Sequence, residues 1–324
     1  MCVTMKPPFK ITEKINNLCA EITRLIGKYE GLTLPTPKPK LRRHTRIVSI
    51  QSSLAIEGNT LSTEQVTDII NNKRVIGPKK DILEVKNAVK VYDLLHEYKP
   101  DNLKSLLKAH KILMDGLVKD AGKLRNGNVG VRSESGVVHT APKFTLVPKL
   151  MDNLFTFMKE EKELHPLIKS SVFHYEFEFI HPFMDGNGRI GRLWQSVILY
   201  RYDKIFEYIP VEIIIKRRQM EYYEAIQKST DQGESTEFIK FMLETIKQAT
   251  TQFTRGIKPA RQSTEIRLNM AKEHFGKTLF RRKDFLEIHN EISPQTATKD
   301  LAFAVRNGLL EKTGENINTK YRFK

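Results

Sequence analysis

The segment from His181 to Arg192 reads His-Pro-Phe-Met-Asp-Gly-Asn-Gly-Arg-Ile-Gly-Arg and constrains the fold more than any other part of the chain. Its glycines allow a tight turn whose backbone N–H groups face inward, and a helix that begins near Asn187 adds its positive N-terminal end. Arg189 and Arg192 are three residues apart on that helix, so their side chains lie on one face. The segment therefore predicts a turn and helix start that bind an anion.

The same segment carries groups that suit phosphate chemistry. His181 has the only nearby ring whose protonation changes close to neutral pH. Asp185 is a hard oxygen ligand of the kind that Mg²⁺ takes together with substrate phosphates. Arginine side chains bind phosphate oxygens through two parallel hydrogen bonds. The sequence thus predicts a nucleoside triphosphate site with a proton acceptor beside it.

These residues resemble the signature of the Fic family, H-x-F-x-[D/E]-G-N-G-R-x-x-R, at every fixed position. Members of that family transfer AMP from ATP to a Ser, Thr or Tyr hydroxyl of a target protein, so the resemblance implies ATP as substrate and Mg²⁺ as cofactor. It also implies that His181 is the catalytic general base and that Asp185 is the metal ligand. Gly186, Asn187 and Gly188 would form the anion hole. Arg189 would bind the β-phosphate, Arg192 would bind the γ-phosphate, and Phe183 would be a buried apolar plug. A branch resembling the toxin Doc has Lys at the position of Gly188 and transfers phosphate, so Gly188 favours nucleotidyl transfer.

A second motif lies upstream, where Ser53, Glu57 and Gly58 resemble the family's inhibitory signature [S/T]-x-x-x-E-[G/N]. Residues 42–56 contain no Gly or Pro and predict a helix that ends at Gly58, with Ser53 and Glu57 on one face. The resemblance implies that Glu57 pairs with Arg192 and displaces the γ-phosphate into an unproductive pose. Some members with this glutamate also remove AMP by positioning a water, and the sequence leaves both roles open.

A third element lies between the two motifs. Arg125, in Gly122–Asn126, resembles the family's G-x-x-R stretch. The β-prone residues around Ser133–Gly136 predict a hairpin with Gly136 in its turn. Val137, Val138, His139 and Thr140 resemble the family's flap. An edge strand there would hold a target peptide through its backbone, with His139 facing solvent rather than acting in catalysis.

Other candidate groups are weaker. Tyr222 and Tyr223 resemble a stretch that encloses the adenine, although aromatic residues on helices usually pack in cores, as we expect for Trp194. Glu176 and Glu178 are two residues apart on a helix, hence on different faces, and do not form an acid/base pair. Gly276-Lys277-Thr278 lacks the first glycine of a P-loop.

The chain of 324 residues has a net charge of +16, with surpluses of seven positive charges in residues 1–50 and six in residues 256–324. The two cysteines are too few for a disulfide framework or a zinc cluster. No apolar run reaches the length of a membrane span, and residues 1–10 contain two prolines and no apolar stretch. We therefore expect a cytoplasmic protein with no membrane segment; a homo-oligomer stays possible.

The C-terminal residues predict a winged helix-turn-helix domain. A helix over 280–289 precedes a second that Ser293 and Pro294 begin and Gly308 ends, and strands over 309–312 and 319–323 follow. The polar side chains of the second helix that could contact DNA bases are Gln295, Thr296, Thr298 and Lys299. On the wing, Lys320 and Arg322 could contact phosphates. The domain fits DNA or docking on a protein, and the modest charge surplus does not decide between them.

The apolar spacing and the helix start and stop signals along the chain predict a mainly α protein. The expected fold is a Fic-type helical bundle with a β-hairpin flap, followed by the C-terminal domain. Helices are expected over 12–29, 42–56, 80–98, 103–117, 151–162, 166–179 and 192–202, with a short one after the capping box Ser62-Thr63-Glu64-Gln65 and an extended Pro-rich connection over 31–39. The expected domains are an N-terminal helical region 1–100 with an inhibitory helix about 42–57, a catalytic core 101–250, a linker 251–262 and the domain 263–324. Two functions remain: a protein adenylyltransferase inhibited by its own Glu57, or a DNA-binding regulator whose core senses nucleotide.

Overall fold

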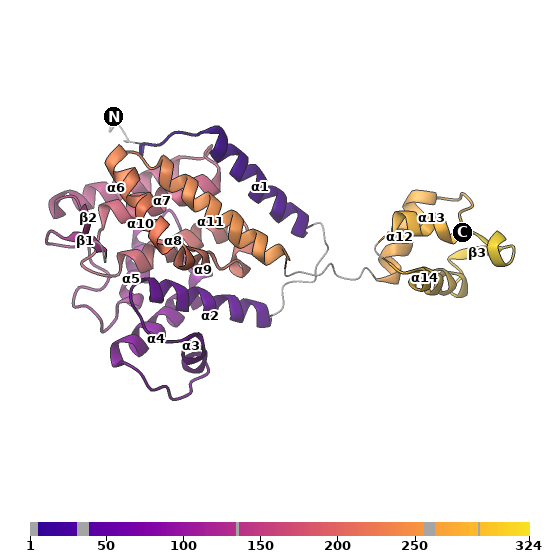
Figure 1. The fold of residues 1–324 in the computed structure, drawn as a ribbon, viewed down its shortest axis with the longest axis horizontal. Coiled ribbons are helices and arrows are strands. Elements are labelled where there is room, and N and C mark those ends of the chain that lie inside the picture. The colour runs from indigo at the N-terminus through magenta and orange to yellow at the C-terminus, as the bar shows by residue number, and fades with distance from the viewer. Residues whose placement is uncertain (1–5, 31–38, 134–135, 256–262, 291) are drawn as a thin grey trace. The chain divides into compact units, whose positions relative to one another are not determined.

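The computed structural model describes residues 6–30, 39–133, 136–255, 263–290 and 292–324. The chain divides into two compact units, Met1–Lys258 and Pro259–Lys324, and each has its own hydrophobic core (Figure 1). The described part of the chain contains no helix with both the length and the apolar character needed to cross a membrane.

The first unit is helical apart from one hairpin. Its elements are α1 (Glu13–Glu30), α2 (Pro39–Ile56), α3 (Thr63–Ile70), α4 (Lys79–Asp93), η1 (Leu95–Glu97), α5 (Leu103–Leu113), β1 (Gly130–Ser133), β2 (Gly136–Thr140), η2 (Phe144–Leu146), α6 (Val147–Glu160), α7 (Pro166–Ile180), α8 (Asn187–Tyr202), η3 (Lys204–Tyr208), α9 (Val211–Arg217), α10 (Gln219–Gln232) and α11 (Thr236–Arg255). The predicted linker at 251–262 therefore starts too early, because α11 continues through Arg255.

Helices α7 and α8 form the centre of this unit. Both are buried on nearly all sides, as expected of helices that are enclosed by others, and Phe177 and Trp194 are completely buried. Helix α7 packs against α6, α8 and α11, while α2 lies across α4 and α9. The short connection between α7 and α8 is thus held at both ends by buried helices.

Capping residues start several helices where the sequence predicts. Thr12 accepts a hydrogen bond from the Ile15 N–H at 3.3 Å, and Asn102 accepts one from the Ser105 N–H at 3.0 Å. Ser62 and Gln65 form the expected capping box of α3. Several predicted boundaries are wrong. Helix α2 begins at Pro39, a residue suited to a first helical turn. The helix expected to reach residue 98 ends at Asp93, where the 3-10 turn η1 follows, the helix expected to reach residue 117 ends at Leu113, and the helix expected over 151–162 spans Val147–Glu160. The rest of the Pro-rich connection lies outside the described residues.

Strands β1 and β2 form an antiparallel hairpin, and β2 lies against α10. Gly136 pairs with Ser133 as the first residue of β2, so it does not lie in the turn as predicted; the turn itself is outside the described residues. The register shifts between Val131 and Arg132, which marks a β-bulge that bends the ribbon.

The second unit contains α12 (Thr264–Phe275), α13 (Arg282–Ile288), α14 (Pro294–Arg306), β3 (Leu310–Thr313), η4 (Asn316–Asn318) and β4 (Lys320–Phe323). Ser293 caps α14, and β3 pairs with β4 in antiparallel register from Leu310 opposite Phe323. Helix α12 was not predicted. One of its few buried positions is Arg267, which pairs with Asp300 at 2.6 Å, so the helix lacks the regular apolar spacing that a sequence reveals.

Candidate functional site

The connection between α7 and α8 begins with a strained residue. His181 ends α7 in the left-handed region (φ 49°, ψ 60°), which costs a residue with a Cβ on the order of 1–3 kcal/mol. Arg125 offsets this cost: its Nε donates to the His181 carbonyl at 2.8 Å, and its backbone N–H donates to the Pro182 carbonyl at 2.9 Å. The backbone of the predicted base is therefore fixed by the arginine of the G-x-x-R stretch.

The same guanidinium also reaches the hairpin. Arg125 Nη1 donates to the Gly127 carbonyl at 2.8 Å, and Nη2 donates to the Pro142 carbonyl. Gly127 precedes β1 and Pro142 follows β2, so both ends of the hairpin and the His181 backbone share one buried side chain. Within the predicted flap, the side chains of Val137, Val138, His139 and Thr140 lie outside the described part; their backbone forms β2.

Two buried side chains hold the rest of the turn. The Asn187 side chain donates to the Phe183 carbonyl and accepts from the Phe183 N–H, both at 2.9 Å. The Phe183 ring is completely buried and stacks on the His110 ring with 3.6 Å between centroids. Phe183 therefore lies where a buried plug is expected. Because both polar atoms of the Asn187 side chain are occupied in this way, an anion at the start of α8 would contact the backbone N–H groups of the helix rather than the Asn187 side chain.

His110 is a site residue that sequence reasoning missed. The Gly122 N–H donates to His110 Nδ1 at 2.8 Å, so the proton lies on Nε2, which donates to the Asp185 carbonyl at 3.0 Å. Burial lowers the pKa of His110 to about 4. The ring is therefore neutral and holds the carbonyl of the predicted metal ligand.

We expect the stability of the protein to fall on acidification because of His110. Its folded pKa of about 4 lies below the usual 6.5, so the unfolded state binds the proton first as the pH falls from 6.5 towards 4. This group alone should cost about 2 kcal/mol of unfolding free energy between pH 7 and pH 5. Urea unfolding of wild type and His110→Asn at both pH values measures the effect. The variant should lose less stability than wild type; an equal loss in both would assign the pH dependence to other groups.

His181 carries the geometry of a proton acceptor. Its Nδ1 lies 3.3 Å from the Glu178 carbonyl, which can only accept, so the proton is on Nδ1 and Nε2 presents a lone pair. Burial lowers the pKa of His181, although the Glu178 carboxylate opposes the shift. The neutral ring thus predominates at pH 7.

The second motif meets the first at Arg192, which is 2 % exposed. Its Nη2 donates to Glu57 Oε1 at 2.7 Å and to the Ser53 carbonyl at 3.0 Å, while its Nε donates to Ser53 Oγ at 3.1 Å. Burial alone would lower the pKa of Arg192, but the adjacent Glu57 and the nearby Tyr222 raise it above its usual range. The structure therefore brings Ser53, Glu57 and Arg192 into direct contact.

Glu57 also occupies the start of α8. A Cβ added at Gly188 would lie 2.4 Å from Glu57 Oε1, so the carboxylate fills the space that a side chain would take at that position. Gly186 adopts φ +85°, and a Cβ there would meet the Met114 sulfur at 2.6 Å. Both glycines are thus required by close approaches, and the Glu57 carboxylate lies where helix N–H groups favour an anion.

Arg189 is held by two carboxylates. Its Nη1 donates to Glu84 Oε1 at 2.8 Å and its Nη2 donates to Asp185 Oδ1 at 2.8 Å. Glu84 is 5 % exposed and accepts from the Asn59 side chain at 2.8 Å as well. Sequence reasoning missed Glu84, because a glutamate in a Lys-rich helix has no distinctive pattern.

Asp185 fits the predicted metal role. Its Oδ1 is engaged by Arg189 and by the Gly186 N–H, while Oδ2 has no hydrogen-bond partner among the described residues. No group of three or more His, Cys, Asp or Glu side chains in the described ranges is arranged to hold a metal ion. Mg²⁺ commonly binds through one or two carboxylates plus substrate phosphates, so one free carboxylate oxygen suits a metal that arrives with a nucleotide.

The two tyrosines proposed to enclose the adenine differ. Tyr222 is 1 % exposed, its hydroxyl lies 3.1 Å from His174 Nε2, and its ring packs on Phe238. This is a core position, as is typical of helical aromatics. Tyr223 is half-buried and its hydroxyl accepts from Gln219 at 3.3 Å. Tyr223 therefore suits a ligand contact better than Tyr222 does.

Known proteins are similar to this chain in sequence and in fold. The profile of the Fic/DOC family matches residues 100–199, which include the whole His181–Arg192 segment. A protein adenylyltransferase Fic of Nematostella vectensis is 30 % identical over 207 residues, which are 60 % of this chain and 45 % of that protein. A protein adenylyltransferase fic-1 of Caenorhabditis briggsae is 26 % identical over 230 residues, 67 % of this chain and 43 % of that one. The chain thus spans less than half the length of these curated relatives.

Solved structures of Fic proteins resemble this chain as well. A Fic family protein from Desulfovibrio desulfuricans is 38 % identical, with a TM-score of 0.75 over 99 % of this chain and 98 % of that one. Fic-1 of C. elegans, at 21 % identity, shares the fold with a TM-score of 0.62 over 75 % of this chain and 72 % of that one. Because the family profile covers the motif and a Fic family protein of 38 % identity matches nearly all of this chain, this chain belongs to the Fic/DOC family.

Proposed function

We propose that this protein transfers AMP from ATP to a Ser, Thr or Tyr hydroxyl of a target protein, and that Glu57 holds the activity in check. The observation that carries the proposal is the convergence of three groups at the start of α8: the His181 lone pair, the free Asp185 oxygen and the guanidinium of Arg192. The adenylyltransferase names of the curated relatives support the same reaction.

In this proposal, His181 Nε2 accepts the proton of the target hydroxyl while its oxygen attacks the α-phosphorus of ATP. The bond between the α-phosphorus and the bridging oxygen breaks, and pyrophosphate leaves. Asp185 would hold Mg²⁺, which neutralises phosphate charge when bound. Arg189 and the N–H groups at the start of α8 face the phosphates, and Tyr223 is the candidate contact for the adenine.

Autoinhibition follows from competition for one guanidinium. Arg192 is the predicted grip on the γ-phosphate, and Glu57 already accepts its Nη2 hydrogen bond. A carboxylate and a phosphate use the same donors, so the pair must open before Arg192 can bind ATP productively. Water positioning by Glu57, and hence AMP removal, is compatible with the same placement.

The hairpin is the proposed holder of the target. Strand β2 pairs with β1 on one side and lies beside α10. An extended target segment would add to a hairpin edge through its backbone, which explains how a hydroxyl is presented to His181 without a fixed sequence around it.

The position of a radioactive label tests the reaction type. Incubation of a protein lysate with ATP labelled at the α-phosphate should label target proteins, because AMP retains that phosphorus. ATP labelled at the γ-phosphate should add no label beyond that of the lysate without the protein, because that phosphate departs with pyrophosphate. Label added by the protein from γ-labelled ATP alone would mean phosphate transfer and would refute the proposal.

A second candidate function is DNA binding by the second unit, acting with or without the transfer reaction. The observation that favours it is the exposure of Gln295, Thr298 and Lys299 on α14, with Arg282 bonded to Thr298 at 3.1 Å. Thr296 is half-buried, Lys320 is partly exposed and Arg322 is paired with Glu311 on the hairpin. A helix followed by a hairpin of this kind also fits protein docking.

A gel-shift assay with salt titration decides this point. If the unit binds DNA through phosphates, the logarithm of affinity should fall linearly with the logarithm of salt concentration, with a slope of about −0.9 per phosphate contacted. The variant Lys299→Gln should weaken binding, while Lys149→Gln in the first unit serves as the charge-matched control. Absence of any shift at low salt would remove the DNA-binding function.

A further inference from the structure

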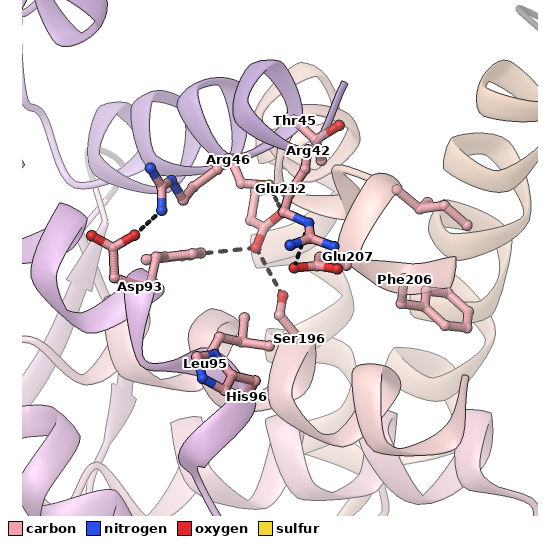
Figure 2. Close-up of a pocket in the computed structure, with 13 residues that line it drawn as sticks. Arg42, Thr45, Arg46, Asp93, Leu95, His96, Ser196, Phe206, Glu207 and Glu212 are labelled. Atoms are coloured by element: carbon pink, nitrogen blue, oxygen red, sulfur yellow. Dashed lines mark hydrogen bonds and ion pairs between the residues drawn. The ribbon is translucent and has the colours of Figure 1, made fainter. Parts of the chain in front are cut away.

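A cavity of 190 Å³ lies between α2, α4, α8 and α9, and none of the residues from His181 to Arg192 lines it (Figure 2). Each of these helices contributes polar side chains. They include Arg42, Arg46 and Ser49 from α2, Asp93 from α4, Ser196 from α8 and Glu212 from α9. The proposed transfer reaction assigns no role to any of these six residues.

Glu212 is the most buried charge of the cavity, at 2 % exposed. It accepts hydrogen bonds from Ser49 Oγ at 2.7 Å, Ser196 Oγ at 2.9 Å and the Tyr92 hydroxyl at 3.4 Å. A carboxylate has about four acceptor positions, so one remains. In the described part of the chain no Lys, Arg or His forms an ion pair with it. The partners of this carboxylate are thus the hydroxyls of two serines and a tyrosine, and the first turn of α9 holds it.

The two arginines of the cavity are each in an ion pair with a carboxylate, although Arg46 Nε is buried without a hydrogen-bond partner among the described residues. Arg46 pairs with Asp93, and Arg42 Nε lies 3.0 Å from Glu207 Oε1 (Figure 2). These pairs are more exposed than Glu212 and lie towards solvent. The described lining therefore contains two arginines and three carboxylates, and Glu212 is the carboxylate without an arginine partner. A buried charge of this kind gains most from a single positive partner that brings its own hydrogen-bond donors.

We propose that this cavity is a binding site for a small organic cation with a primary ammonium group, which pairs with Glu212. A primary ammonium has three donors and one charge, which suits the remaining acceptor position of Glu212 and the neighbouring serine oxygens. At about 30 Å³ per water in the liquid, the cavity equals roughly six waters, enough for an amine of several carbon atoms.

The cavity adjoins the helix that carries the proposed inhibitory residues. Arg42, Arg46 and Ser49 lie on the stripe of α2 that continues to Ser53, since the spacing is four, three and four residues. The Tyr92 hydroxyl donates to Glu212 Oε1 at 3.4 Å and lies near Ser53, whose Oγ accepts from Arg192 Nε at 3.1 Å. Polar side chains therefore lie between the cavity and Arg192.

The site would be inhibitory, an inference that rests on the proposed function. The cavity exists in the conformation in which α2 is docked and Glu57 is paired with Arg192. A ligand that binds this conformation more tightly than an opened one shifts the population towards it. An amine bound to Glu212 would therefore lower AMP transfer without touching the phosphate site.

Direct binding tests the site independently of any catalysis. Isothermal calorimetry of the full chain with butylammonium and with 1-butanol, its neutral counterpart of similar shape, should give at least about a tenfold preference for the amine. Glu212→Gln keeps the size of the side chain and should reduce the affinity for butylammonium to that of 1-butanol. Glu163→Gln, the same change at an exposed position, should leave it unaltered. Equal binding of amine and alcohol, no binding of either, or retained preference in Glu212→Gln would overturn the site.

The effect on transfer separates this inference from the proposed function. Saturating butylammonium should lower transfer by wild type several-fold and leave the Glu57→Gly variant unaffected, because that variant has no pair to stabilise. Inhibition of both variants alike would refute the coupling to α2. If neither variant transferred AMP, the proposed function would fail, while the calorimetric result for Glu212 would still decide whether the amine site exists.

Discussion

Replacing His181 with alanine should lower AMP transfer by at least about 10²- to 10⁴-fold, the usual contribution of a general base. The change removes the Nε2 lone pair that would accept the hydroxyl proton, and it leaves Arg192, Asp185 and the start of α8 in place. The measurement is best made with the Glu57→Gly variant as parent, so that inhibition does not mask the signal. Transfer from α-labelled ATP is then compared between Glu57→Gly and Glu57→Gly/His181→Ala.

The matched control is His274→Ala, which removes an exposed histidine of the second unit. The pH profile gives an independent readout. Because burial lowers the pKa of His181 below 6.5, the base is neutral at pH 7 and becomes protonated only as the pH falls through that lowered value. Transfer should therefore be constant above pH 7 and decline at acidic pH, with a midpoint below 6.5. Undiminished transfer in the His181 variant would exclude this residue as the base.

Replacing Glu57 with glycine should raise AMP transfer by about 10- to 100-fold. A hydrogen bond to a charged group contributes about 1.5–3 kcal/mol, and loss of that competitor frees Arg192 for the nucleotide. Glu57→Gln keeps the size but removes the charge and should give an intermediate increase. Glu160→Gln, at an exposed position at the end of α6, is the control. Transfer that stays at the wild-type rate in Glu57→Gly would contradict autoinhibition.

The Glu57→Gly variant should also differ from wild type in thermal stability. Without Glu57, the buried Arg192 keeps its contacts with Ser53 but loses its negative partner, and breaking a buried pair in this way costs several kcal/mol. ATP supplies the missing negative charge. The melting temperature of Glu57→Gly should therefore be lower than that of wild type without nucleotide and should rise more on addition of Mg-ATP.

Some of the site follows from sequence because its residues are neighbours along the chain. The strained His181 and the glycines at 186 and 188 lie close together in the sequence, between the end of α7 and the first turn of α8, where the backbone determines the geometry. The contact between Glu57 and Arg192 spans 135 residues, and only the resemblance of both motifs to one family suggests it.

Other contacts leave no trace in the sequence. Glu84 lies 105 residues from Arg189 on a helix whose composition suggests an ordinary solvated surface, and only the packing of α4 buries it. Helix α12 is hidden for a related reason, since it buries Arg267 through the Asp300 pair rather than through apolar side chains. Long-range pairing of charges is decided by tertiary structure, which neither composition nor periodicity reports.

Arg125 has a consequence for target choice. Its guanidinium holds the backbone of His181 and both ends of the hairpin, so the distance from the hairpin edge to the base is set by the dimensions of one arginine side chain. Successive side chains of an added strand point to opposite faces. A target shifted by one residue would turn its hydroxyl away, and one shifted by two would miss the base by about 7 Å. Arg125 would thus set the register in which a target strand must bind for its hydroxyl to reach His181.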